Sequence, residues 1–80
     1  MPIVSAKIMF EGKYGKSGPY NFKIRPELAA ELKTGDLVVC ATRFGYSIAI
    51  FSGLETVTDP VKEKKITKSV LQRVATEHDI

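Results

Sequence analysis

The sequence predicts a mainly β protein: a small five-stranded barrel, SH3-like or OB-like, with one short helix. Three observations predict it. Residues 3–11 and 20–25 alternate between apolar and polar side chains, which is typical of half-buried strands. Residues 35–53 contain two apolar runs around a short break, which is typical of a hairpin. Only residues 26–35 begin and end like a helix. Eighty residues are expected to form a single domain, 1–80.

The two N-terminal strands follow from period two. In the first, Val4, Ala6, Ile8 and Phe10 share one face. In the second, Tyr20, Phe22 and Ile24 share one face. Between them, residues 12–19 read GKYGKSGP, and this run of glycines predicts a loop.

The helix is expected over residues 26–33. Pro26 suits a first helical position, where its missing N–H would be unpaired anyway. Glu27 favours the positive end of the helix dipole. Leu28 and Leu32 are four residues apart and share one face, and Gly35 is a suitable stop.

The hairpin is apolar on both faces, unlike an ordinary surface hairpin. With Phe44-Gly45 as its loop, Ala41 lies opposite Ile48 and Val39 opposite Ile50, while Cys40 lies opposite Ala49 and Val38 opposite Phe51. We therefore expect a central hairpin with both faces covered. The predicted core is Val4, Ile8, Phe22, Leu32, Val39, Ile48 and Ile50.

The C-terminal part is less regular. Residues 54–65 are polar, and Asp59-Pro60 indicates a turn. The apolar positions of residues 66–74 fit a helix and a strand equally well, and periodicity alone does not separate the two.

Composition narrows the class of protein. The lone cysteine, Cys40, excludes an intramolecular disulfide and favours a reducing, cytoplasmic location. We expect no signal peptide and no membrane span. The net charge is +3, which permits an anionic partner without requiring one. Positive charge gathers in residues 1–25 and 60–76, whereas residues 26–59 are net negative.

Residues 20–54 carry a resemblance in four parts: an aromatic–x–aromatic strand, Pro-Glu-Leu opening a helix, Leu-Lys-Thr-Gly-Asp after it, and a paired apolar hairpin. This pattern resembles the 3′-DNA-end-binding domain of the primosomal replication-restart helicase. It is also similar to small stand-alone proteins of phages and mobile elements of Gram-positive bacteria.

The resemblance implies a small β-barrel, and in the helicase family this domain grips the terminal nucleotide of a DNA strand. Asn21 stands where that family has an acidic residue implicated in recognition of the 3′-OH. The resemblance also favours a closing strand over a helix for residues 66–74.

The candidate nucleic-acid-binding residues fall into groups. Lys13, Tyr14 and Lys16 lie in the glycine-rich segment, which is otherwise a plain flexible loop. Arg43 and Phe44 form the hairpin tip, where a phenylalanine either stacks a base or folds back on its own barrel. A basic strip, or an ordinary solvated face, would contain Lys7, Lys23, Arg25, Lys65 and Lys68. Asn21 completes the set.

Catalytic and metal-binding patterns are not evident. Gly15-Lys16-Ser17 matches the end of a phosphate-binding loop, but Phe10 stands where its first glycine belongs, and Pro19 and a strand follow instead of a helix. His78 is the only histidine, and it has no partners at metal-ligand spacing or in a catalytic triad. We expect no enzyme, no cofactor and no metal. Two hypotheses remain: binding of single-stranded nucleic acid, or interaction with a host or phage protein.

Overall fold

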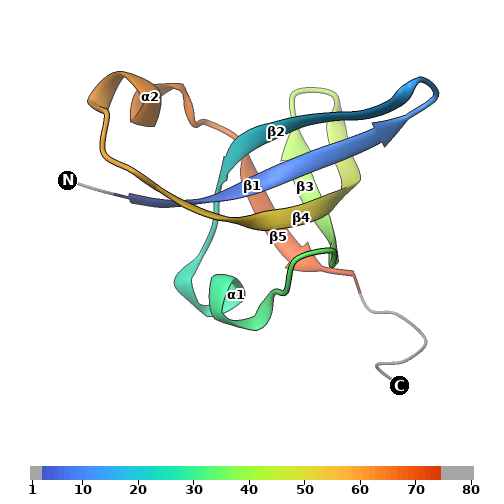
Figure 1. Ribbon diagram of the computed structural model, residues 1–80, viewed down its shortest axis with the longest axis horizontal. Coiled ribbons are helices and arrows are strands. Elements are labelled where there is room, and N and C mark those ends of the chain that lie inside the picture. The colour runs from blue at the N-terminus through green and yellow to red at the C-terminus, as the bar shows by residue number, and fades with distance from the viewer. Residues whose placement is uncertain (1–2, 75–80) are drawn as a thin grey trace.

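The computed structural model describes residues 3–74 and is mainly β, with five strands that close into a ring and two short helices (Figure 1). The elements are β1 (Ile3–Gly12), β2 (Gly15–Lys23), α1 (Pro26–Glu31), β3 (Leu37–Thr42), β4 (Gly45–Val57), α2 (Pro60–Lys65) and β5 (Ser69–Arg73). Around the ring the order is β1-β2-β5-β3-β4, and β4 pairs again with β1. The β2–β5 contact is parallel and consists of one pair, Lys23 with Ser69.

The glycine-rich segment is not a loop, as the sequence suggested, but the outer half of a β1–β2 hairpin. The strands pair out to Gly12 and Gly15, and only Lys13 and Tyr14 form the turn. Gly15 and Gly18 have positive φ, which glycine adopts without steric cost. Because Gly18 lies at a register shift of the β1–β2 ladder, the glycines allow a bulged strand here rather than ending it.

The predicted hairpin of β3 and β4 is confirmed, but its register is different. Thr42 pairs with Gly45, so the loop is Arg43-Phe44. The Thr42 hydroxyl donates to the Gly45 carbonyl at 2.9 Å and accepts the Phe44 N–H at 3.2 Å. Gly45 has a φ of +111°, and with these bonds it closes the ladder one residue earlier than expected.

This register moves each β3 residue two positions along β4. Val39 lies opposite Ile48, and Val38 lies opposite Ala49. A shift of two residues keeps every side chain on its face, because side chains alternate with period two.

The core occupies the inside of the ring and the end that α1 covers. Its buried members are Ala6, Ile8, Phe22, Leu28, Leu32, Val38, Cys40, Ala49, Phe51 and Val70. The predicted core residues Ile8, Phe22 and Leu32 are confirmed.

The other predicted core residues are wrong. Val4 is 50% exposed, Ile48 is 62% exposed, and Val39 and Ile50 are half-buried. The ring buries one face of the hairpin, the one with Val38 and Phe51. The two faces are equally apolar in the sequence, and both were predicted to be covered. Within residues 3–74, no other element buries the face that carries Val39, Ile48 and Ile50.

Helix α1 begins at Pro26 as predicted and buries Leu28. Helix α2 was not predicted, so residues 3–74 contain two helices where the sequence predicted one. Asp59 caps it, because its side chain accepts the Val61 N–H at 2.9 Å, and Pro60 occupies the first turn. The same Asp-Pro pair that indicated a turn is thus a helix start.

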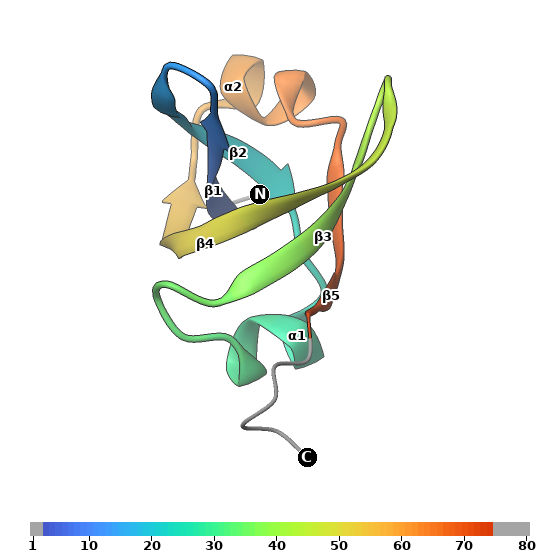
Figure 2. The ribbon, with the colours of Figure 1, turned by 90° about the vertical axis from the view of Figure 1, so that its right-hand side faces the viewer.

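The tail forms strand β5 over part of residues 66–74, in agreement with the strand alternative. Ile66 is buried directly after α2, before the strand begins at Ser69. The two hairpin tips and α2 lie at one end of the molecule, and α1 lies at the other (Figure 2).

Candidate nucleic-acid interface

A groove opens beside β2, where the ring is weakest. Because β2 and β5 share a single residue pair, the chain from α2 to β5 runs past β2 without forming a ladder. The resulting cavity has a volume of about 360 Å³. Its lining residues are Phe10, Tyr20, Asn21, Phe22, Lys65, Ile66, Thr67 and Lys68.

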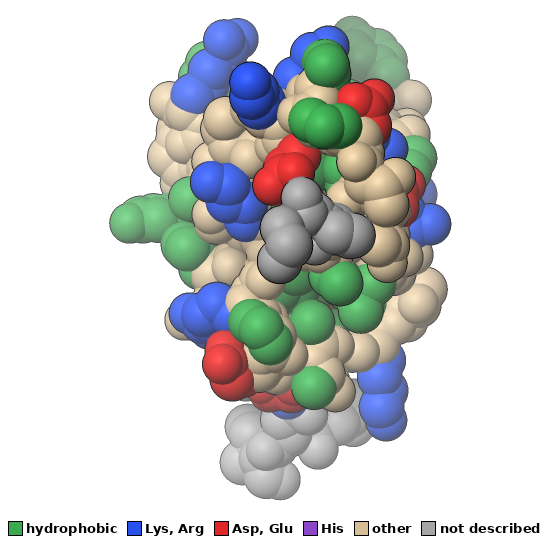
Figure 3. Space-filling view, turned by 90° about the vertical axis from the view of Figure 1, so that its left-hand side faces the viewer, with side chains coloured by type: hydrophobic (Ala, Val, Ile, Leu, Met, Phe, Trp, Pro, Cys, Tyr) green, Lys and Arg blue, Asp and Glu red, His purple; other side chains and the backbone are tan. Residues whose placement is uncertain are grey.

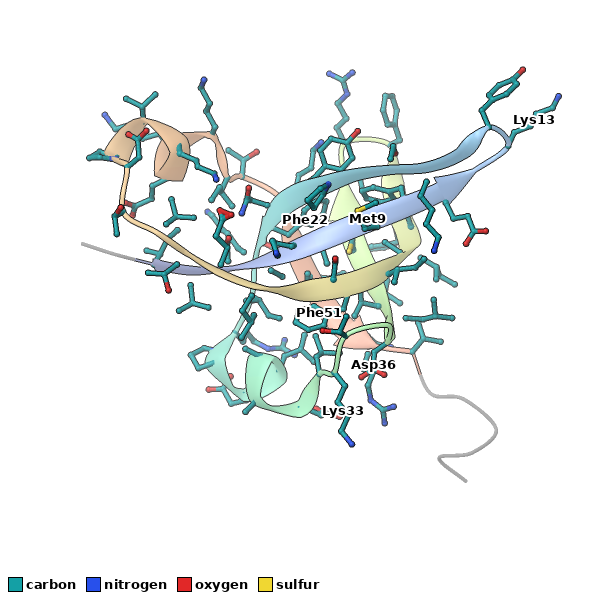
Figure 4. The ribbon with its side chains drawn as sticks, in the orientation of Figure 1. Met9, Lys13, Phe22, Lys33, Asp36 and Phe51 are labelled. Atoms are coloured by element: carbon teal, nitrogen blue, oxygen red, sulfur yellow. The ribbon has the colours of Figure 1, made fainter. Side chains whose placement is uncertain are left out.

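Three aromatic rings line one wall of the groove. The Phe10 ring centroid lies 5.9 Å from that of Tyr20 and 5.9 Å from that of Phe22, with tilted planes in both pairs. Phe22 is buried and points into the ring (Figure 4), whereas Tyr20 is 49% exposed. Tyr20 is therefore held by Phe10 on one side and still offers a surface to a ligand.

Asn21 is tied to the fold through its amide nitrogen. This nitrogen donates to the hydroxyl of the buried Ser5 at 2.7 Å and to Glu55 Oε2 at 3.2 Å. Glu55 Oε2 also accepts from Lys62 Nζ at 2.7 Å. These bonds lower the pKa of Glu55, with the Lys62 hydrogen bond as the largest cause and the Asn21 bond as the second. The network links β1, β2, β4 and α2, and Asn21 is the member of it that lines the groove.

The basic residues of the groove are Lys65 and Lys68, which are exposed. Lys68 also lines a neighbouring hollow together with Arg43 and Thr42. At the hairpin tip, the Arg43 guanidinium lies 4.8 Å from the centroid of the Phe44 ring. Phe44 is 85% exposed, so it does not fold back on the barrel. Three of the predicted cations thus lie along one continuous stretch of surface.

The tip of the β1–β2 hairpin carries Lys13, Tyr14 and Lys16 away from the ring (Figure 4). Lys13 Nζ lies 5.9 Å from the centroid of the Tyr14 ring, and Tyr14 is 96% exposed. These side chains form a projecting arm rather than a wall of the groove.

The predicted basic strip is divided between different hollows. Lys23 and Arg25 line a hollow beside β5, whereas Lys65 and Lys68 line the groove. Arg25 donates to the Leu71 carbonyl at 2.9 Å, at the register shift of the β3–β5 ladder, so it has a structural role. Lys7 is half-buried on β1, with its stem against Gly53.

Sequence reasoning missed five of the groove residues, which are Phe10, Tyr20, Phe22, Ile66 and Thr67. The aromatic–x–aromatic pattern of β2 drew attention to Asn21 between the two rings. The ring of Tyr20 belongs to the same pattern, and an aromatic side chain near cations is the signal typical of a single-strand-binding surface.

Comparisons of this chain with protein families, with curated proteins and with solved structures found no match. Within residues 3–74, no helix is long and apolar enough to cross a membrane. The same part of the chain holds no cluster of three or more His, Cys, Asp or Glu side chains that could bind a metal. His78 lies outside the described residues.

Proposed function

We propose that this protein binds single-stranded nucleic acid, without strong sequence preference, in the groove beside β2. The observation that carries the proposal is the half-exposed ring of Tyr20 in the same groove as Lys65 and Lys68. Proteins that bind single strands combine rings that stack bases with cations that follow the phosphates. Stacking tolerates every base, because each has a π-face, so little sequence preference follows.

The surroundings of the groove support the same proposal. Arg43 and Phe44 extend it along the β3–β4 tip, and Lys13 and Tyr14 lie on the other hairpin tip. The opposite end, around α1, carries the acidic side chains Glu27, Glu31 and Asp36. The groove cations and the exposed rings therefore lie away from these acidic side chains, which favours binding of an anionic strand at the groove end of the molecule.

The proposal also covers the type of barrel, the cellular location and the class of protein. The long strand β1 pairs with both β2 and β4, with register shifts in both ladders, which supports a small barrel of the SH3-like or OB-like kind. The lone buried Cys40 supports a reducing cytoplasm. With the resemblance of residues 20–54, this describes a small non-catalytic protein of the phage or mobile-element type.

Fluorescence anisotropy with labelled single-stranded DNA and RNA at low salt tests the proposal. We expect weak binding that falls steeply as salt rises, because phosphate contacts release counterions. Lys65→Glu should weaken binding to all sequences and lessen the salt dependence. Lys33→Glu is the matched control, because it reverses one charge beside α1 at the far end of the molecule (Figure 4).

The stacking role of the Tyr20 side chain is tested separately. Tyr20→Ala should weaken binding by about 1–3 kcal/mol, the range for loss of one stacked base. Tyr46→Ala, which removes an exposed tyrosine from the outer face of β4, should leave binding unchanged. Absence of binding by the wild type at low salt, or equal binding by Lys65→Glu and Lys33→Glu, would contradict the proposal.

A second candidate function is interaction with a host or phage protein. An apolar hollow of about 530 Å³ lies between α1 and the start of β1, and Figure 3 shows hydrophobic side chains gathered on this face. Its lining residues are Ile3, Val4, Ile24, Pro26, Ala29, Ala30 and Leu54. Capture of the same host protein with and without nuclease treatment, and its loss in Ala30→Glu, would favour this function over the first.

A further inference from the structure

The outer half of β4 has an open edge. Strand β1 pairs with β4 from Ile3 to Met9, and the last pair joins Met9 to Ile50. Beyond it, the two hairpins diverge, as Figure 2 shows. Among residues 3–74, no strand pairs with residues 45–49 on the side away from β3. This edge belongs to neither the groove nor the apolar hollow.

The backbone groups at this edge can be identified from the ladder. Phe51 donates its N–H to the Asp36 carbonyl and accepts from the Gly35 N–H, both at 2.8 Å, so its backbone faces β3. Antiparallel pairs alternate between bonded and non-bonded residues. Tyr46 and Ile48 therefore direct their N–H and C=O groups away from β3, toward the open edge.

The open edge of β4 lacks the features that usually prevent an exposed strand edge from pairing with another chain. Residues 45–49 contain no charge and no proline, and the β3–β4 ladder has no bulge. Natural proteins use these devices to prevent a strand edge from pairing with another chain. Here the edge instead carries exposed apolar side chains, with Tyr46 79% and Ile48 62% exposed.

We propose that this edge pairs with the same edge of a second copy, so that the protein forms a two-fold symmetric dimer. An antiparallel pairing centred on Ser47 places Tyr46 of each copy opposite Ile48 of the other. Both residues have their backbone groups free, so four hydrogen bonds form. The sequence around Ser47 is thus self-complementary, as a two-fold interface requires.

Charge supports a second copy as the occupant. The register carries the hairpin tip of each copy to the place where β1 of the other leaves the sheet at Met9. The tip carries Arg43, and β1 continues from Met9 to the exposed Glu11. The pairing therefore brings side chains of opposite charge from the two copies toward each other at both ends of the interface. The same pairing lengthens the apolar outer face, because Tyr46 and Ile48 of both copies lie on one side.

The interface is small, so we expect a weak dimer. In sedimentation equilibrium from micromolar to millimolar protein, the average mass should rise from 8.8 kDa toward twice that value. Ile48→Lys should remain a monomer with unchanged thermal stability, because the side chain is exposed. Thr56→Lys is the control and should still dimerise, because it lies on the part of β4 that pairs with β1.

Cross-linking tests the register. In the proposed pairing, the two Ser47 residues face each other as a non-bonded pair, in which β-carbons lie about 4.5–5.5 Å apart. Ser47→Cys should therefore form a disulfide-linked dimer under mild oxidation far faster than Thr56→Cys. A monomeric wild type at millimolar concentration, or a dimer that survives Ile48→Lys, would overturn the proposed edge. Equal cross-linking rates of the two cysteine variants would overturn the register.

Discussion

Gly18 lies at the bulge of β2 with a φ of +118°. A β-carbon at this position would lie 2.8 Å from the Ile8 carbonyl oxygen of the neighbouring strand. This distance is shorter than any ordinary contact with backbone, and neither strand can move without disturbing the ladder. The requirement for glycine here is therefore steric as well as conformational.

We expect Gly18→Ala to destabilise the protein by more than Gly45→Ala, whose φ is +111° but whose β-carbon would meet nothing within 4 Å. The unfavourable φ alone costs about 1–3 kcal/mol, and the clash adds to it at Gly18 only. Thermal denaturation of both variants measures the difference. Equal midpoints would show that the β2 bulge relaxes freely.

Cys40 is fully buried in β3, and burial raises the pKa of its thiol to about 11. Thiolate is the reactive form, so the folded protein should react with a thiol reagent at pH 8 only through unfolding. The exposed cysteine of Thr56→Cys is the control and should react at once. Rapid reaction of Cys40 in the native protein would contradict its placement inside the ring.

The same pKa affects stability at high pH. The folded thiol stays neutral to a higher pH than the unfolded one, so its contribution is complete below the ordinary pKa of 9.0 and is lost as pH rises toward 11.

At the scale of elements, α2 is fixed to the ring by polar contacts, because none of its residues is buried. The chief contact is the Lys62–Glu55 ion pair, with Nζ and Oε2 2.7 Å apart. Asn21 donates to the same oxygen. Since α2 leads into residues 65–68, this contact also sets the position of one wall of the groove.

Lys62→Ala should raise the pKa of Glu55 toward its ordinary value of 4.5, because the largest cause of its lowering is the Lys62 hydrogen bond. A carboxyl with a lowered folded pKa adds stability above its unfolded pKa, and this is lost as pH falls through the folded value. An NMR titration of the Glu55 carboxyl in both proteins measures the shift. An identical pKa in the variant would show that α2 does not rest on β4.

Local signals predicted some elements well and others poorly. Pro26 with Leu28 and Leu32 defined α1, because caps and spacing act within a few residues. For α2, Asp59-Pro60 fits a turn and a helix start equally, and the deciding contact is with Glu55, two residues before β4 ends at Val57. The hairpin register depended on whether Arg43 or Gly45 shared the two-residue loop with Phe44, a choice that the Thr42 hydroxyl makes through its bonds.

At the scale of the molecule, neither the core face of the hairpin nor the groove could be predicted from sequence. Val38 and Val39 are equal in size and character, and only closure of the ring decides which is buried. The groove joins Tyr20 to Lys65, residues from separate segments that meet because β2 and β5 share a single pair. The sequence shows which residues are cations and which are aromatic, but their grouping in space comes from the order of strands around the ring.

Closure of this ring depends on β5, the short strand that bridges β2 and β3. It inserts Val70, which is 3% exposed, into the core beside Cys40, its partner in the β3–β5 ladder. Gln72, two residues on, is exposed. Because every strand of the ring depends on its neighbours, loss of β5 should unfold the whole domain rather than fray one edge.

We therefore expect Val70→Asp to abolish the folded state and Gln72→Asp to leave it intact. A buried charge without a partner costs on the order of 3–5 kcal/mol, in addition to the lost packing of Val70, and small domains are stable by only about 5–15 kcal/mol. Circular dichroism and NMR dispersion of the amide signals distinguish the outcomes. If Val70→Asp keeps dispersed signals from β1 and β4, these strands fold without β5, and the ring is two independent halves rather than one cooperative unit.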